Sequence, residues 1–144
     1  MAIGKTNFGD GYGTGTVGAD GFLGPLTSSA IVSASLLSGA TTTGVTAFAG
    51  GGQSSATAIT TPVASVDTVA TAADSVKLPA PTYAGQMVFL VNTSANSMQV
   101  FGAGTDTINA VATATGVAQA AGKSALYVAT TTGTAAKWWR LLSA

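Results

Sequence analysis

Histidine, cysteine and glutamate are absent from this chain, and charged residues of any kind are scarce. Without histidine or cysteine, the chain lacks the commonest general base, the thiol nucleophile and the usual zinc ligands. A Ser–His–Asp triad is excluded for the same reason. The absence of cysteine also excludes disulfides. These absences argue against an enzyme, and we expect no catalytic residues, no metal site and no cofactor.

Charged residues make up 7% of the chain, with five acidic and five basic side chains and a net charge of zero. Ordinary soluble domains carry about 25% charged residues. A surface with so little charge is poorly protected against association. The composition therefore suits a protein that packs against copies of itself or against a larger assembly. Because no basic patch is present to neutralise phosphates, we expect no nucleic-acid partner.

No apolar run reaches the roughly 18 residues that a membrane-spanning helix needs. Residues 22–39 come closest, but Pro25 and several serines interrupt this segment. The residues before it are a poor match to the charged start of a secretory signal. From the sequence we expect a soluble, unprocessed chain with no membrane partner.

Residues 1–55 are predicted to form an extended arm rich in glycine, threonine and alanine. Eight glycines fall within residues 1–24, and this density makes regular structure costly. A short helix is one interpretation of residues 26–37, and a strand is the alternative. The triplet at 50–52 marks a break. Large side chains that could dock on another surface are spaced through the arm: Phe8, Tyr12, Phe22 and Leu23.

Residues 56–144 are predicted to form a β-rich module. Residues 86–101 contain two apolar runs of strand length separated by turn residues, which predicts a β-hairpin at the core of the module. A final hairpin is predicted to pair 123–129 with 137–142. Further short strands are predicted at 58–63, 65–70, 74–78 and 108–114. The whole pattern predicts an all-β protein, a small β-sandwich or barrel.

Three features of the sequence could indicate a catalytic or ligand-binding site, but each has a plainer structural interpretation. Asp67 and Asp74 could act as a glycosidase pair only if their carboxyl groups stood about 5–9.5 Å apart. We favour turn and strand-end aspartates. The glycine-rich run at 9–15 lacks the Gly-Lys-Ser/Thr ending of a phosphate loop. Asp10 and Asp20 lack the ligand spacing of a calcium loop.

Two neighbouring tryptophans near the end of the chain allow two interpretations. Trp138 and Trp139, together with Tyr127, could form an aromatic platform that stacks on sugars. Alternatively, one tryptophan fills the core and the other lies at a subunit interface, where tryptophan is enriched. Because neighbouring residues of a strand face opposite sides, both cannot point into the core of one monomer. We favour the second interpretation.

Part of the chain, from about residue 66 to residue 140, resembles a known family of proteins. The resemblance is carried by Asp74-Ser-Val-Lys-Leu-Pro, by Met98-Gln-Val-Phe-Gly-Ala-Gly-Thr-Asp-Thr-Ile-Asn109 and by Val111-Ala-Thr-Ala-Thr-Gly116. These segments resemble a module of tailed-bacteriophage virion proteins that decorate or cement the capsid or form head fibres. Where the resemblance leads us to expect glycine after Ile-Asn, this chain has Ala110.

The resemblance implies a non-enzymatic capsid cement protein on the outer surface of the virion. Such a protein would be an intertwined homotrimer that bridges neighbouring copies of the major capsid protein. The alternative is a head-fibre or host-surface glycan-binding protein that uses the aromatic residues near its C-terminus. Besides the side chains of the arm, the residues expected at capsid or subunit interfaces are Met87, Phe89, Phe101, Tyr127, Trp138 and Trp139.

Overall fold

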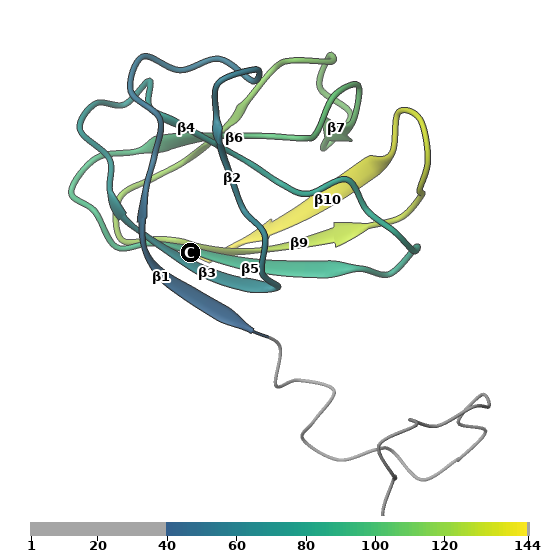
Figure 1. The fold of residues 1–144 in the computed structure, drawn as a ribbon, viewed down its shortest axis with the longest axis horizontal. Helices are drawn as coiled ribbons and strands as arrows, with labels where there is room; N and C mark the ends of the chain where they lie inside the picture. Colours follow the sequence, from purple (N-terminus) through teal and green to yellow (C-terminus); the bar gives the residue numbers. More distant parts are fainter. Residues whose placement is uncertain (1–39, 144) are drawn as a thin grey trace, which may run out of the picture. The chain divides into compact units, whose positions relative to one another are not determined.

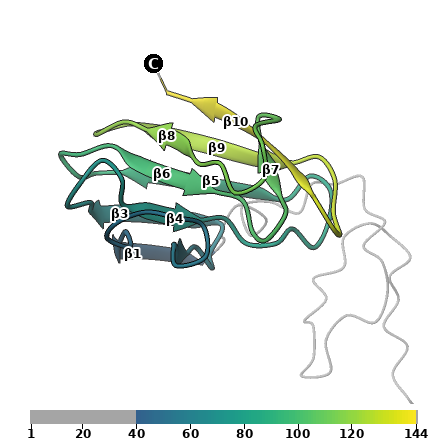
Figure 2. The same ribbon diagram turned by 90° about the horizontal axis from the view of Figure 1, so that it is seen from above.

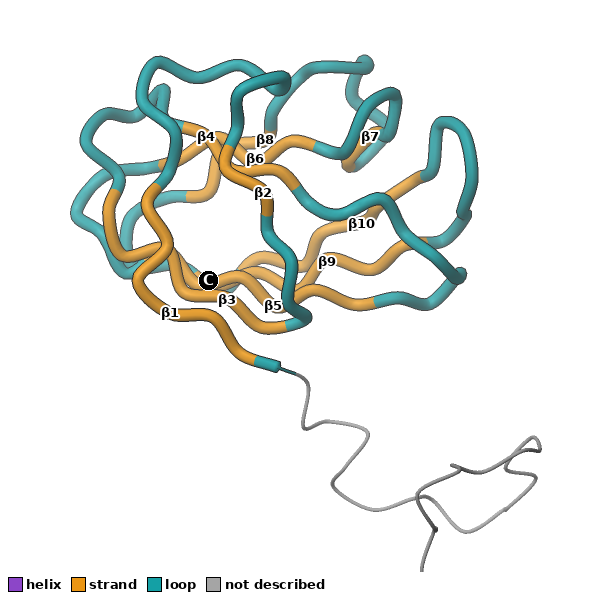
Figure 3. Tube along the Cα trace, in the orientation of Figure 1, coloured by secondary structure: helices purple, strands orange, loops and turns teal. Residues whose placement is uncertain are grey.

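The computed structural model describes residues 40–143, which form ten strands and no helix. The strands are β1 (Thr41–Thr46), β2 (Thr57–Ala58), β3 (Val63–Thr68), β4 (Ser75–Lys77), β5 (Met87–Asn92), β6 (Met98–Phe101), β7 (Thr107–Ile108), β8 (Val117–Gln119), β9 (Ser124–Ala129) and β10 (Lys137–Leu142). They build a six-stranded sheet, in the order β1-β3-β5-β9-β10-β7, and a four-stranded sheet, in the order β2-β4-β6-β8. The two sheets face each other with loops at both ends (Figures 1 and 3). This arrangement confirms the all-β prediction and is sandwich-like.

The first six strands wind through both sheets in turn. β1, β3 and β5 pair in parallel in the larger sheet, while β2, β4 and β6 pair in parallel in the smaller one. Each pass of the chain therefore stacks on the one before it, as Figure 2 shows for β1, then β3 with β4, then β5 with β6. Equivalent positions in successive passes, such as Thr57, Val76 and Val100, differ in residue type. The strands therefore show no sequence repeat from which this winding could have been predicted.

The predicted hairpin over residues 86–101 is wrong, although both of its strands exist. β5 pairs with β3 and β9, whereas β6 pairs with β4 and β8 in the opposite sheet. Between β5 and β6 the chain crosses from one sheet to the other. Hydrogen bonds of the Asn92 side chain stabilise this corner. Its Nδ2 donates to the carbonyl of Asn96 at 2.9 Å, and its Oδ1 accepts from the amide of Ser94 at 3.1 Å. The local sequence predicts the two strands and the turn. Which strands they pair with is determined by contacts with residues distant in the sequence.

The predicted final hairpin is confirmed. β9 and β10 pair in antiparallel fashion, with Trp138 opposite Ala129 and Leu142 opposite Ala125. The strand predicted at 108–114 is much shorter, because β7 covers only Thr107–Ile108 and the chain then turns through Ala110. β8 was not predicted.

The module begins earlier than the predicted division between residues 55 and 56. β1 lies on the arm side of that division, yet it pairs in parallel with β3. Gly51 is also part of the packed structure, because a Cβ at this position would lie 2.6 Å from the carbonyl oxygen of Ala73. The Thr/Gly/Ala composition of this stretch resembles low complexity, but threonine is a good strand former. Residues 1–39, with the predicted helix and the four docking side chains of the arm, lie outside the described residues.

The core lies between the two sheets. Its largest fully buried side chains include Trp138, Tyr127, Leu78, Leu90, Met98 and Ile108. Buried polar groups require partners, and the hydroxyl of Tyr127 donates to Oε1 of Gln119 at 2.9 Å, while Gln119 Nε2 donates to the carbonyl of Leu90 at 3.0 Å. This chain of bonds links β9, β8 and β5 across the core. No helix in the described part of the chain could span a membrane.

Candidate assembly surface

The outer face of the six-stranded sheet is largely apolar across β5, β9 and β10, whereas β1 consists mostly of threonine. Strand alternation points Met87 and Phe89 of β5 outward, together with Trp139 and Leu141 of β10. Their exposed fractions are 50% and 39% on β5, and 49% and 63% on β10. The strands between and beside them add half-buried apolar residues. We define the apolar sheet face as Val63, Met87, Phe89, Val91, Leu126, Val128, Trp139 and Leu141.

The register of the strands makes this face continuous. Met87 pairs with Val128, which pairs with Trp139. One row further along, Phe89 pairs with Leu126, which pairs with Leu141, while Val63 lies on the other side of Phe89. Directly paired residues lie on the same side of a sheet and contact each other. The face therefore extends without interruption across β3, β5, β9 and β10.

Among residues 40–143, charged side chains on this side of the sheet lie only near its margins, at Asp67 on β3 and Lys137 on β10. Taking about 200 Å² for a large side chain, the four most exposed residues present about 400 Å² of surface. Exposed apolar patches of this size often mark sites of interaction with proteins or ligands. The four strands thus present a continuous apolar surface whose charged neighbours lie at its margins.

The structure divides the interface residues predicted in the module into two groups. Met87, Phe89 and Trp139 come together on the apolar sheet face. Phe101, Tyr127 and Trp138 are instead buried within the module, so they cannot contact another subunit through this face. Leu126, Val128 and Leu141 complete the face but were not predicted. A signal was present, because β9 and β10 are apolar at both alternating positions, as a strand covered on both sides would be.

The expectation that the two tryptophans face opposite sides is confirmed. Trp138 is fully buried between the sheets, and its neighbour Trp139 is half exposed on the outer side. This arrangement overturns the sugar-stacking platform of Trp138, Trp139 and Tyr127. Tyr127 is fully buried on the inner side, so only one of the three rings can reach a ligand.

The two aspartates considered for catalysis have separate structural roles. Hydrogen bonds from Ser65 and Thr93 hold the pKa of Asp67 below its usual value, and Asp67 Oδ2 accepts from the amide of Gly44 at 2.9 Å. Asp74 is buried in the turn before β4. Bonds from the hydroxyl and the amide of Thr71, at 2.8 and 3.0 Å, lower its pKa. Each carboxylate therefore stabilises a different part of the chain.

Two further buried groups, Asp106 and Tyr127, have shifted pKa values. Burial raises the pKa of Asp106 despite the bond that its Oδ1 accepts from the amide of Ala136 at 2.8 Å. Burial also raises the pKa of Tyr127 to about 12, so this phenol is neutral at physiological pH. Within the described residues, no three carboxylates gather into a group that could hold a metal ion.

Comparison with protein families, with curated proteins and with solved structures gave no match to this chain.

Proposed function

We propose that this chain is a structural virion protein that cements or decorates a phage capsid. In this proposal it is a homotrimer that bridges neighbouring major-capsid subunits, and it has no enzymatic activity. The observation that carries the proposal is the apolar sheet face, a surface suited to protein contacts on a chain with 7% charged residues. The resemblance of residues 66–140 to phage virion modules supplies the biological setting.

In the proposed trimer, the apolar sheet faces of three copies pack around the threefold axis. At about 25 cal/mol per Å², burying about 400 Å² of apolar surface contributes roughly 10 kcal/mol per subunit before the costs of association. Those costs are of similar size, on the order of 4–15 kcal/mol. The face therefore suffices for a trimer only if most of it is covered, and removing one or two large side chains should disrupt the assembly.

In this proposal, surfaces other than the apolar sheet face contact the capsid. The sequence predicts anchors at Phe8, Tyr12, Phe22 and Leu23, which lie outside the described residues. Ordering an arm on a shell costs about 1–2 kcal/mol per residue. Many copies on one lattice offset this cost through multivalency.

The proposed function is tested with capsid shells of the parent phage that lack this protein. Purified full-length protein is added, and bound protein is measured by co-sedimentation together with the temperature at which the shells rupture. We expect saturable binding at a fixed ratio to the major capsid protein and a higher rupture temperature. Shells that neither bind the protein nor gain heat resistance would refute the cement function.

A further inference from the structure

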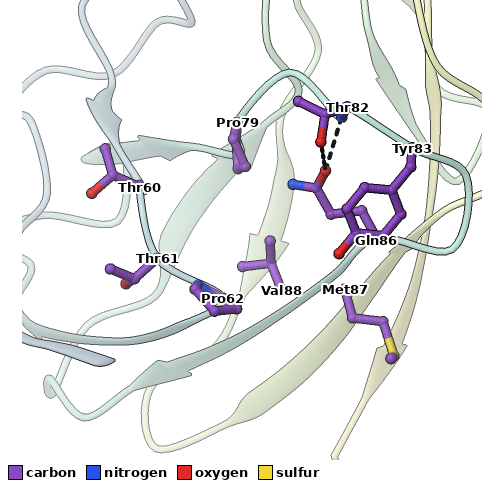
Figure 4. Close-up of a pocket in the computed structure, with 9 residues that line it drawn as sticks. All are labelled: Thr60, Thr61, Pro62, Pro79, Thr82, Tyr83, Gln86, Met87 and Val88. Carbon is purple, nitrogen blue, oxygen red and sulfur yellow. Dashed lines mark hydrogen bonds between the residues drawn. The ribbon is translucent and has the colours of Figure 1, made fainter. Parts of the chain in front are cut away.

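A small pocket opens at the end of the module where the β2–β3 and β4–β5 connections approach each other. Its volume is about 210 Å³. Threonines and a proline from the first connection form one wall, and residues around Tyr83 form the opposite wall (Figure 4). The lining residues are Thr60, Thr61, Pro62, Pro79, Thr82, Tyr83, Gln86, Met87 and Val88.

One wall offers a flat aromatic ring beside a fixed amide. Tyr83 is 61% exposed, the largest aromatic exposure among the described residues. Oε1 of Gln86 accepts from the amide of Thr82 at 2.8 Å and from its hydroxyl at 3.1 Å. These two bonds fix the orientation of the Gln86 amide, which leaves its Nε2 available to donate to a ligand. Across the pocket, Thr60 adds an exposed hydroxyl.

The backbone around the pocket is already held in place. The carbonyl of Pro62 accepts from the amide of Phe89 at 2.7 Å, and the amide of Gly85 donates to the carbonyl of Ala129 at 2.7 Å. The hydroxyl of Thr61 donates to the carbonyl of Val63 at 2.8 Å. A ligand would therefore meet a preformed site, which lowers the entropic cost of binding.

The chemistry of the lining selects the class of ligand. None of the lining residues carries a charge, so the pocket offers no ion-pair partner to a carboxylate or a phosphate. An exposed aromatic face suits the apolar side of a sugar ring, while the amide and hydroxyl groups suit its hydroxyls. The volume lies below the roughly 300–1,000 Å³ of sites for drug-sized ligands. It matches one ring of a larger molecule.

We propose that this pocket binds one ring of a neutral saccharide. The Tyr83 ring stacks on the sugar, the Gln86 amide donates to a ring hydroxyl, and Pro62 and Pro79 limit the depth of entry. The proposal does not rest on the cement function. The pocket lies beside the apolar sheet face and shares with it only Met87. A protein that stabilises shells can therefore also carry a site for a surface glycan.

The test uses full-length protein and four neutral methyl glycosides, those of glucose, galactose, mannose and N-acetylglucosamine. Binding is measured by saturation-transfer NMR and by titration up to about 50 mM, because a single-ring contact is expected to be millimolar. Tyr83→Ala and Gln86→Ala each remove one element of the site. Phe48→Ala is the matched control, because Phe48 is an exposed aromatic residue outside the lining.

We expect at least one glycoside to bind, and to bind about tenfold more weakly to Tyr83→Ala and to Gln86→Ala. Phe48→Ala should bind as the wild type does, and all variants should unfold at similar temperatures. The proposal is overturned if no glycoside binds, or if binding survives both pocket substitutions. A change in oligomeric mass in Tyr83→Ala would also overturn it, since the pocket would then belong to a subunit contact.

Discussion

The corner between β5 and β6 depends on a single buried amide, which leads to a quantitative prediction for Asn92→Asp. Nδ2 of Asn92 donates to the carbonyls of Asn96, Gln119 and Ala120 at 2.9, 3.1 and 3.1 Å. The side chain is fully buried. Aspartate has nearly the same shape, but at neutral pH it places a carboxylate oxygen against three carbonyl oxygens. The substitution therefore isolates hydrogen bonding and charge from packing.

Removing one partner of a buried, hydrogen-bonded group costs about 1–3 kcal/mol, and an uncompensated buried charge costs about 3–5 kcal/mol. We therefore expect Asn92→Asp to lower the free energy of unfolding by about 3–5 kcal/mol at pH 7. Part of this loss should be recovered as the pH falls towards 4, because the introduced carboxyl then binds a proton and regains one donor. Asn96→Asp is the control, since Asn96 is exposed and donates to the carbonyls of Val69 and Ala70. Its cost should stay near 1 kcal/mol.

The assay is urea denaturation at a fixed protein concentration, followed by circular dichroism at several pH values. Tryptophan fluorescence provides a second probe, because Trp138 is buried between the sheets. A loss below about 1 kcal/mol for Asn92→Asp, or a loss equal to that of Asn96→Asp, would refute the assigned role of the corner. A loss that does not depend on pH would show that charge burial is not its cause.

Three further predictions concern the backbone and one buried carboxyl. Gly51→Ala should lower the free energy of unfolding by about 2 kcal/mol or more, because its φ of +75° disfavours alanine and the new Cβ would meet the carbonyl of Ala73 at 2.6 Å. Gly52→Ala, with φ of +89° and nothing within 4 Å, is the matched control and should cost only about 1 kcal/mol in the same urea titration. Ala110→Gly should raise stability by about 0.5–1 kcal/mol, because Ala110 has a φ of +58°; a loss of stability in calorimetry would contradict this. Burial raises the folded-state pKa of Asp106 above the reference value of 3.8. The contribution of Asp106 to stability therefore declines as the pH rises from 3.8 towards the folded-state pKa. Asp106→Asn should remove that decline from a plot of unfolding free energy against pH, and an unchanged slope would show that another group causes it.

The sequence predicts the class of fold and several strands, because alternation and turn residues are local signals. The opposite facing of Trp138 and Trp139 followed from the strand period alone. The winding of the chain was not predictable in this way, since β5 pairs with β3 and β9 through contacts distant in sequence. β1 was missed because its threonines lie in a stretch whose composition resembles a linker.

The residues of the apolar sheet face were likewise predicted only in part. Met87, Phe89 and Trp139 were predicted as interface residues from their size and hydrophobicity, whereas their gathering on one face depends on the register of β5, β9 and β10. Phe101 was predicted on the same grounds but is buried in the module. Size and hydrophobicity alone do not distinguish a core residue from an interface residue, because both are apolar.

We propose that copies of this chain cover one another's apolar sheet face, and the molar mass of the full-length protein in solution tests this packing. Size-exclusion chromatography with light scattering would compare the wild type with the double variant Phe89→Ser/Leu141→Ser. Phe48→Ser, which removes an exposed aromatic residue elsewhere on the module, is the control. We predict a trimer for the wild type and the control, and a folded monomer for the double variant. A monomeric wild type, or a trimer that survives the double substitution, would contradict the claim.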